Sequence, residues 1–240
     1  MKTPRYYLMI IVALAVAGCS QTAILYVPPP AHLPLLKDAG QADMSVLGGI
    51  YGIDVRAAWS PVKHLEVFGL GSYHDTRADS SEHALHSYGE IGAGWYTGKE
   101  SIIFSVVAGY GWGHAVGFGR DFSWERQMPA YEVSGSYTRP FAGLGIGYSG
   151  RVDTTAAIEY REYGLTIRAA RAIFHDIQGI PGTSRGGGWY VEPVLVSRIG
   201  SRMIQLEAQT GFTSGDYSAG VESVDYFFSV GIHLQLDRIF

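Results

Sequence analysis

Apolar and polar residues alternate along most of the chain, and a period of two is typical of β-strands. The pattern is clearest in residues 223–236, where every second residue is apolar and the residues between them are mostly small or polar. It recurs at residues 87–96, 102–110, 139–148 and 202–212. The chain from residue 41 to its end is therefore predicted to be all-β.

The connections between the expected strands alternate in length, as in antiparallel up-and-down transmembrane β-barrels. Short turns are expected at 60–63, 97–100, 149–153 and 199–201, and longer polar loops near 75–86, 113–136, 166–187 and 214–222. With a first hairpin around residues 51–52, about ten strands are expected, with eight as the alternative. Residues 165–177 fit either a strand extension or a short helix. An even number of strands puts both chain ends on the side of the short turns.

The position of the aromatic residues predicts which face of the barrel points outward. Alternation alone does not, because a soluble barrel alternates too, with its apolar face inside. On the apolar face of the expected strands, aromatic residues lie at both strand ends, with aliphatic residues and glycine between them. Those beside short turns are Trp59, Trp95 and Tyr148, and those beside loops are Tyr73, Tyr110, Trp189, Phe212 and Tyr226. Two aromatic girdles are typical of a barrel that crosses a membrane with its apolar face outward.

The N-terminal 40 residues differ from the rest of the chain. Residues 1–18 have the basic start, apolar stretch and small-residue end of an export signal. The sole cysteine, Cys19, follows Val-Ala-Gly, which resembles the lipobox of bacterial lipoproteins, where the cysteine becomes the acylated first residue. The alternative is an ordinary secretory signal. Residues 19–40 are proline-rich and predicted to be an extended tether, either a spacer or a plug in the barrel lumen. Residues 41–240 would form the barrel.

Composition excludes several classes of protein. Charged residues make up 17% of the chain and its formal net charge is −4, without a block of Lys or Arg, so nucleic acid is not an expected partner. A single cysteine excludes an internal disulfide framework. No stretch beyond the N-terminus has the roughly 20 apolar residues of a membrane-spanning helix. A membrane could then be crossed only by a closed barrel.

Charged residues of both signs lie at the alternating positions that are expected to face inward on several strands. Buried charges must be paired, so this set is predicted to be a salt-bridged filling of a closed lumen. The alternative is a polar pore or a ligand site. Phe68 and Leu70, on the same parity, argue against a wide channel. The predicted lumen charges are Asp54, Arg56, Glu66, Glu90, Arg139, Glu159, Arg161, Glu192, Glu207 and Asp225.

Other candidate chemistry is sparse. The histidines at 74, 83, 86 and 114 are expected to be solvated in or beside loops, because a metal site needs further converging ligands. No nucleophile accompanies a positioned histidine, so neither an enzyme nor a cofactor is expected. Arg168, Arg171 and Arg185 would make one loop basic, and such a loop could contact lipopolysaccharide phosphates. An ordinary solvated loop is the alternative.

Two segments carry a resemblance to a known family. Residues 229–236 resemble the β-signal of outer-membrane proteins, and the chain ends on an aromatic residue. Residues 26–37, leading into Ala57-Ala58-Trp59-Ser60-Pro61, resemble the lipidated subset of the small OmpA/OmpX-like outer-membrane barrels. The resemblance implies that the outer-membrane assembly machinery reads the last strand, through Gly231, Leu234, Leu236 and Phe240.

The expected function follows from location more than from chemistry. The chain is expected to be a non-enzymatic β-barrel lipoprotein of a Gram-negative outer membrane, with its lipid-anchored N-terminus on the periplasmic side. It would serve as a structural or docking component, with outer-membrane lipids and another envelope protein as partners. The alternative is a small channel or carrier for a polar solute. An outer-membrane enzyme that acts on lipid is a third reading.

Overall fold

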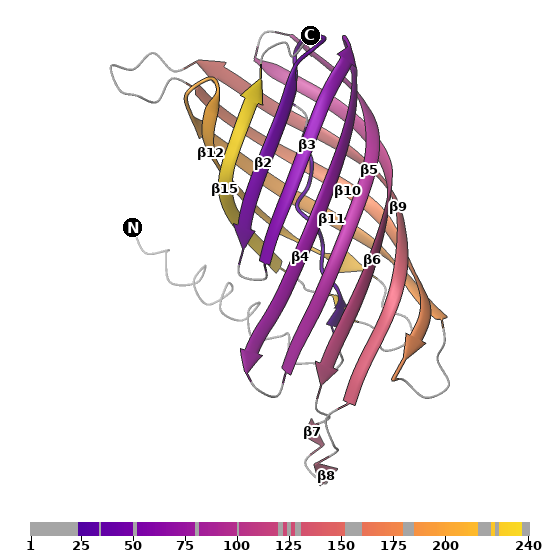
Figure 1. The fold of residues 1–240 in the computed structure, drawn as a ribbon. Helices are drawn as coiled ribbons and strands as arrows, with labels where there is room; N and C mark the ends of the chain where they lie inside the picture. The colour runs from indigo at the N-terminus through magenta and orange to yellow at the C-terminus, as the bar shows by residue number, and fades with distance from the viewer. Residues whose placement is uncertain are drawn as a thin grey trace, which may run out of the picture.

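The computed structural model describes residues 24–33, 35–49, 52–79, 82–99, 101–119, 122–123, 126–127, 131–151, 160–179, 185–215, 222–223 and 226–236. Ten of the strands form a closed antiparallel barrel, in which neighbours along the chain pair and the last strand pairs with the first (Figure 1). They are β2 (Ala42–Gly49), β3 (Gly52–Val62), β4 (Leu65–Asp79), β5 (Glu82–Lys99), β6 (Ile102–Gly119), β9 (Tyr131–Arg151), β10 (Tyr160–Gln178), β11 (Arg185–Gly200), β12 (Ile204–Phe212) and β15 (Tyr226–Leu236). The predicted all-β, up-and-down fold with ten strands is confirmed.

Among the residues that the structure describes, five short strands lie outside this closed ring. β1 (Ile24–Tyr26) pairs in parallel with β14 (Glu222–Ser223). β13 (Ser214–Gly215) adds to β11, and β7 (Phe122–Ser123) pairs with β8 (Arg126–Gln127). In the part of the chain that the structure describes, no helix is long and apolar enough to cross a membrane.

The wall of the barrel is much longer on one side than on the other. β2, β3, β12 and β15 have 8–11 residues, whereas β5, β6, β9 and β10 have 18–21. A tilted strand of about 9–11 residues already crosses a bilayer. The long strands therefore extend past that length, toward the end of the barrel opposite the C-terminus (Figure 1).

These extensions correct the predicted loops. Residues 75–79 and 82–86 are strand, 165–177 extend β10 without a helix, and much of 113–136 is paired between β6 and β9. All four predicted short turns are also wrong at their starts, because β3, β5, β9 and β11 continue to Val62, Lys99, Arg151 and Gly200. Polar residues marked these segments as loops, but a strand that extends into water can carry polar side chains on its outer face and keep its ladder.

The outer face of the barrel is apolar, as predicted. Large aliphatic side chains are exposed around the ring, with Leu144 at 63% and Leu206 at 60%. All eight residues of the predicted girdles face outward with exposed side chains: Trp59, Trp95, Tyr148, Tyr73, Tyr110, Trp189, Phe212 and Tyr226. A water-soluble surface rarely exposes so much contiguous apolar area. Lipid is the environment that matches it.

Beyond the aromatic girdle on the long-loop side, the polar and apolar faces of the wall exchange places. The outer face of the long strands becomes polar, with exposed Glu132, Ser136 and Arg171. The inner face there becomes apolar and aromatic, in a buried cluster that includes Tyr26, Leu70, Tyr88, Ala115, Val133, Tyr137, Ala172, Phe174, Ile177 and Tyr190. The projecting part of the wall is thus organised like a soluble barrel, with its apolar side chains inside.

The outward assignment predicts the effect of a charge at one position. Leu144→Arg should lower the stability of the bilayer-inserted barrel by roughly 2–4 kcal/mol, the cost of an arginine at a lipid-facing midplane site. Ser136→Arg lies on the same face of the same strand beyond the girdle and should have little effect. Urea unfolding of protein refolded into liposomes measures both. Equal stability of Leu144→Arg and the parent would contradict the assignment.

Candidate functional site

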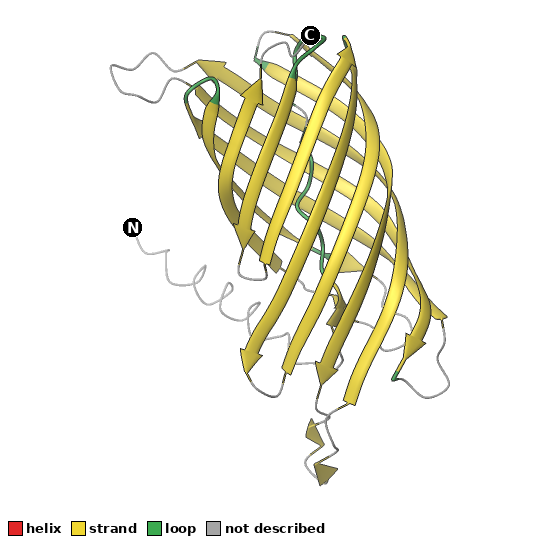
Figure 2. Ribbon diagram, in the orientation of Figure 1, coloured by secondary structure: helices red, strands yellow, loops and turns green. Residues whose placement is uncertain are grey.

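The lumen of the barrel is occupied by the chain's own N-terminal segment. Residues 26–33, 35 and 36, which we call the inner segment, are all buried. Tyr26 ends β1, and Figure 2 shows the described residues that follow it as a loop inside the ring of strands. The interpretation of this region as a spacer outside the barrel is therefore wrong, and the alternative, a plug in the lumen, describes these residues. A ten-stranded barrel has more interior than wall side chains alone fill.

The prolines of the inner segment suit a lumen lined with arginine. Proline has no backbone N–H, so a proline-rich segment presents mainly carbonyl acceptors, and arginine is a donor without an acceptor. Arg168 donates to the carbonyls of Pro29 at 2.5 Å and Pro30 at 3.4 Å. Arg56 donates to the Ala31 carbonyl at 2.6 Å. The wall thus supplies the donors that this segment needs, and a strand ladder is not required.

Glycines on one wall make room for the leucines of the inner segment. A Cβ atom built on Gly145 would lie 2.9 Å from Leu33 Cδ1, and one on Gly147 would lie 2.5 Å from Leu35 Cδ2. Gly164 on the next strand also faces Leu33 too closely for a Cβ. The run of glycines on β9 is therefore a groove that the inner segment fills, and larger residues there would push it out.

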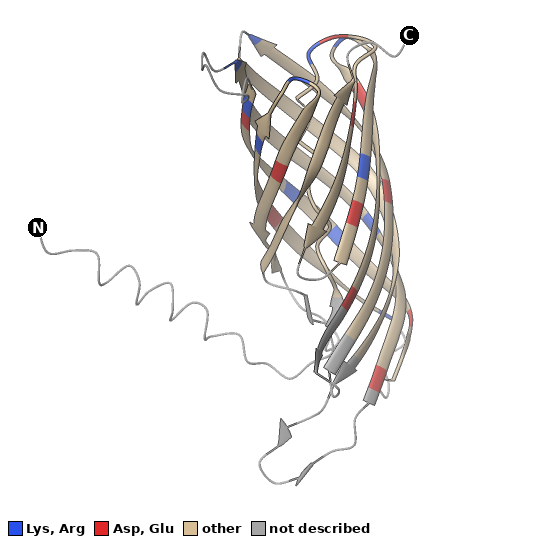
Figure 3. Cartoon of the chain, turned by 60° about the vertical axis from the view of Figure 1, so that its left-hand side comes forward, with Lys and Arg blue, Asp and Glu red and all other residues tan. Residues whose placement is uncertain are grey.

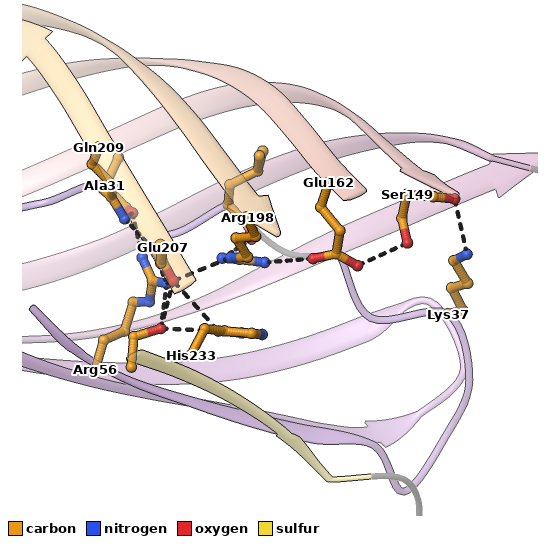
Figure 4. A network of polar contacts seen from close by, with 11 residues as sticks. Ala31, Lys37, Arg56, Ser149, Glu162, Arg198, Glu207, Gln209 and His233 are labelled. Atoms are coloured by element: carbon orange, nitrogen blue, oxygen red, sulfur yellow. Dashed lines mark hydrogen bonds and ion pairs between the residues drawn. The ribbon is translucent and has the colours of Figure 1, made fainter. Parts of the chain in front are cut away.

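One polar network is centred on Glu207 of β12, near the short-turn end (Figure 4). Its carboxylate accepts from Arg56 at 2.9 Å and from Arg198 at 3.1 Å. Arg198 also pairs with Glu162 at 3.2 Å, and Ser149 donates to the same Glu162 carboxylate at 2.8 Å. All of these side chains are buried. The network joins five strands, so it fixes the wall across the lumen.

Ser45, Gln209 and His233 complete this network. Ser45 donates to Glu207 at 2.7 Å and lies 2.9 Å from His233 Nδ1. Gln209 donates both to Glu207, at 2.5 Å, and to the Ala31 carbonyl, at 3.3 Å. Gln209 and Arg56 therefore tie the Glu207 network to the inner segment.

A second network lies nearer the long-loop end. Arg139 pairs with Glu90 at 3.1 Å and with Glu192, and Arg168 pairs with Glu192 at 3.0 Å. Tyr26 of the inner segment donates to Glu192 and accepts from Arg139 at 2.6 Å. Its ring stacks on Tyr190 with centroids 4.5 Å apart. Tyr26 is thus a fixed contact between the start of the inner segment and the charged wall.

Comparison with known proteins assigns no family to this arrangement. Neither the family models nor the curated protein sequences give a match to the chain. The resemblance to OmpA/OmpX-like barrels stays a prediction, and the lumen is interpreted from its own contacts.

Most of the charges predicted for the lumen are buried inside the barrel. Figure 3 shows that charged residues lie on several strands of the wall. Buried there are Asp54, Arg56, Glu66, Glu90, Arg139, Glu192 and Glu207. The prediction is wrong for Arg161, which is half-buried and lies on the same face of β10 as the exposed residues Tyr163 and Leu165. Its neighbour Glu162 is buried instead. The alternation of apolar residues in β10 could have shown that Glu162, and not Arg161, faces inward. Glu159 and Asp225 lie outside the described residues.

Sequence reasoning missed two arginines of the lumen. Arg168, assigned to a basic loop, is buried at mid-strand, while Arg171 and Arg185 are exposed. Arg198 was missed because alternation is lost before it: Val194 and Val196 are apolar and yet point inward. They belong to the same buried cluster as Leu33 and Leu35. Because the inner segment is apolar, the inward-facing wall residues beside it are apolar too, and the polar–apolar alternation of the strand is lost there.

The histidines also differ from expectation. His74 and His86 are buried on the inner face, so their interpretation as solvated loop residues is wrong. His74 Nε2 lies 2.9 Å from Asp54 Oδ1, and His86 Nε2 lies 2.5 Å from the Tyr137 hydroxyl. His114 is exposed, as predicted. Within the described ranges, no group of three or more His, Cys, Asp or Glu side chains is arranged to hold a metal ion.

The predicted assembly residues lie on the strand that closes the ring. Leu234 and Leu236 are exposed on the outer face of β15. A Cβ on Gly231 would collide with the Val46 carbonyl of β2, so this glycine permits close pairing at the seam. Cys19 and Phe240 lie outside the described residues. A role of these residues in assembly stays a prediction.

Proposed function

We propose that this chain is a closed, non-enzymatic outer-membrane β-barrel lipoprotein that acts as a structural or docking component of the cell envelope. The observation that carries the proposal is the filled lumen: a barrel whose outer face matches lipid has its interior occupied by its own buried inner segment. A transport protein needs a passage, whereas an anchor or docking platform needs only a stable wall and exposed loops.

A small cavity at the start of the inner segment is consistent with this reading. A cavity beside Val27 and Pro28, also lined by Asp54 and His74, has a volume of about 10 Å³. That is about the space of a single water molecule. The ion pairs at Glu207 and Arg139 are buried, and both networks contact the inner segment, at Ala31 and at Tyr26. A solute would have to displace both the segment and buried pairs.

A small channel or carrier is the second candidate, and one observation favours it. The inner segment is joined to the wall by side chain–carbonyl hydrogen bonds and apolar contacts rather than by strand pairing along its length. A segment held in this way can leave the lumen without breaking the barrel ladder. In that reading the intact protein would open on a signal.

Planar-bilayer recording of the purified full-length protein tests the proposal. We expect negligible steady conductance over a range of voltages, with an open porin recorded as the positive control. The protein should also fractionate with the outer membrane, and mass spectrometry of its N-terminus should show acyl chains on Cys19. A stable pore in the intact protein would favour the channel instead. Recovery in the soluble fraction would refute the membrane location.

A further inference from the structure

The inner segment runs lengthwise through the barrel, so that Tyr26 and Leu236 lie toward opposite ends of it. β2 begins at Ala42, which pairs with Leu236 at the end of β15 and with Trp59 near the short turn after β3. From there the preceding residues run back through the lumen. Lys37 donates to the Ser149 carbonyl at 3.3 Å, near the turn end of β9. The even number of strands brings Ala42 and Leu236 together, as expected. The residues before Ala42, however, run from this end of the barrel into the lumen.

At its other end the inner segment reaches the long-loop side. β1 pairs with β14, in the connection that precedes β15, and lies against β5, β6 and β9. Tyr26 belongs to the aromatic cluster inside the projecting wall, together with Tyr137 and Phe174. Ten residue steps separate positions 26 and 36. At about 3.1 Å per residue in a polyproline-type conformation they span about 31 Å, roughly the thickness of a bilayer's hydrocarbon core.

We propose that the chain is threaded through its own barrel, so that its N-terminal end is displayed on the long-loop side of the membrane. This inference rests on the proposed function, and it replaces the expectation of an N-terminal anchor on the periplasmic side. Under that function, the acyl group of Cys19 inserts into the leaflet that faces the long loops, and the lipid and the C-terminus lie on opposite sides of the membrane.

The distance from Cys19 to the barrel leaves no route back. Five residue steps separate Cys19 from Ile24. A fully extended chain covers at most about 3.6 Å per residue, so these steps reach about 18 Å. That is less than the roughly 30 Å of the hydrocarbon core. A return path through the lumen would also have to pass the inner segment and the ion pairs that fill it.

Cysteine labelling on intact cells tests the threading. On intact cells, a membrane-impermeant maleimide should label both Thr22→Cys and Arg185→Cys. Arg185→Cys reports on the loop end of β11. The maleimide should label Lys99→Cys, at the turn end of β5, only after the outer membrane is permeabilised. The parent chain, whose sole cysteine is Cys19, gives the background. Arg185 and Lys99 are exposed, so both controls should fold.

The outcomes separate the two proposals. If Thr22→Cys behaves like Lys99→Cys while Arg185→Cys is labelled on intact cells, the threading is refuted and the outer-membrane location stands. If Arg185→Cys and Lys99→Cys are labelled alike, the membrane location itself fails. A peptide tag inserted after Gln21 gives an independent measurement, because protease added to intact cells should remove it. A tag that is protected from protease on intact cells overturns the threading.

Discussion

Deletion of residues 21–38 should turn a silent barrel into a conducting one. The deletion removes the inner segment and leaves Cys19 and all ten barrel strands in place. Without Leu33 and Leu35 the glycine groove at Gly145 and Gly147 is empty, and water can enter along it. Planar-bilayer recording should then show a stable conductance where the parent shows none.

The selectivity of the opened pore is also predicted. Among the described residues, the buried charged side chains of the wall are seven acids and four arginines: Asp43, Asp54, Glu66, Glu90, Glu162, Glu192, Glu207, Arg56, Arg139, Arg168 and Arg198. An excess of carboxylates in a pore favours cations. We therefore expect a cation preference in reversal-potential measurements under a salt gradient.

A shorter deletion is the matched control for this experiment. Removing residues 21–23 shortens the same region but keeps the inner segment, so this variant should stay silent. Heat-dependent migration in gels verifies that each variant is folded. If the longer deletion folds and remains silent, the wall side chains alone close the lumen, and the inner segment is a filling rather than a plug.

Glu207→Gln should be the most destabilising substitution of a single wall charge. Glu207 is buried and accepts from Arg56 and Arg198, and it is the only carboxylate that Arg56 contacts in the described part of the chain. Removing one partner of a buried pair leaves an uncompensated charge and costs about 3–5 kcal/mol. Urea unfolding of liposome-refolded protein should show a loss of this size.

Two variants test the physical cause. Glu132→Gln removes an exposed carboxylate of β9 and should leave the unfolding midpoint nearly unchanged. The double variant Glu207→Gln/Arg56→Gln removes the unpaired cation, so it should be more stable than the sum of the two single losses predicts. Additive losses would mean that Arg56 and Glu207 are not coupled, and that an unpaired Arg56 is not the cause of the loss in Glu207→Gln.

The barrel itself could be predicted from the sequence because its physical cause is local. A period of two, with an apolar face that must meet lipid, fixes which side of each strand points outward. The ends of Ile102–Gly119 and Tyr131–Arg151 were missed because they extend beyond the aromatic girdle on the long-loop side, where the outer face is polar. Polar residues then indicate a water-exposed strand as readily as a loop.

The contents of the lumen depended on tertiary structure. Nothing local distinguishes a proline-rich spacer from a proline-rich plug: the difference is whether arginine donors and a glycine groove converge on it, and these come from strands far apart in sequence. Arg198, which follows the inward-pointing Val194 and Val196, could be assigned to the lumen only once the ring had closed around residues 26–36. The sequence determined a barrel wall with an apolar outer face and charged residues inside it. Tertiary structure decided what fills that wall, because the filling depends on packing between residues more than 100 positions apart, such as Pro29 and Arg168.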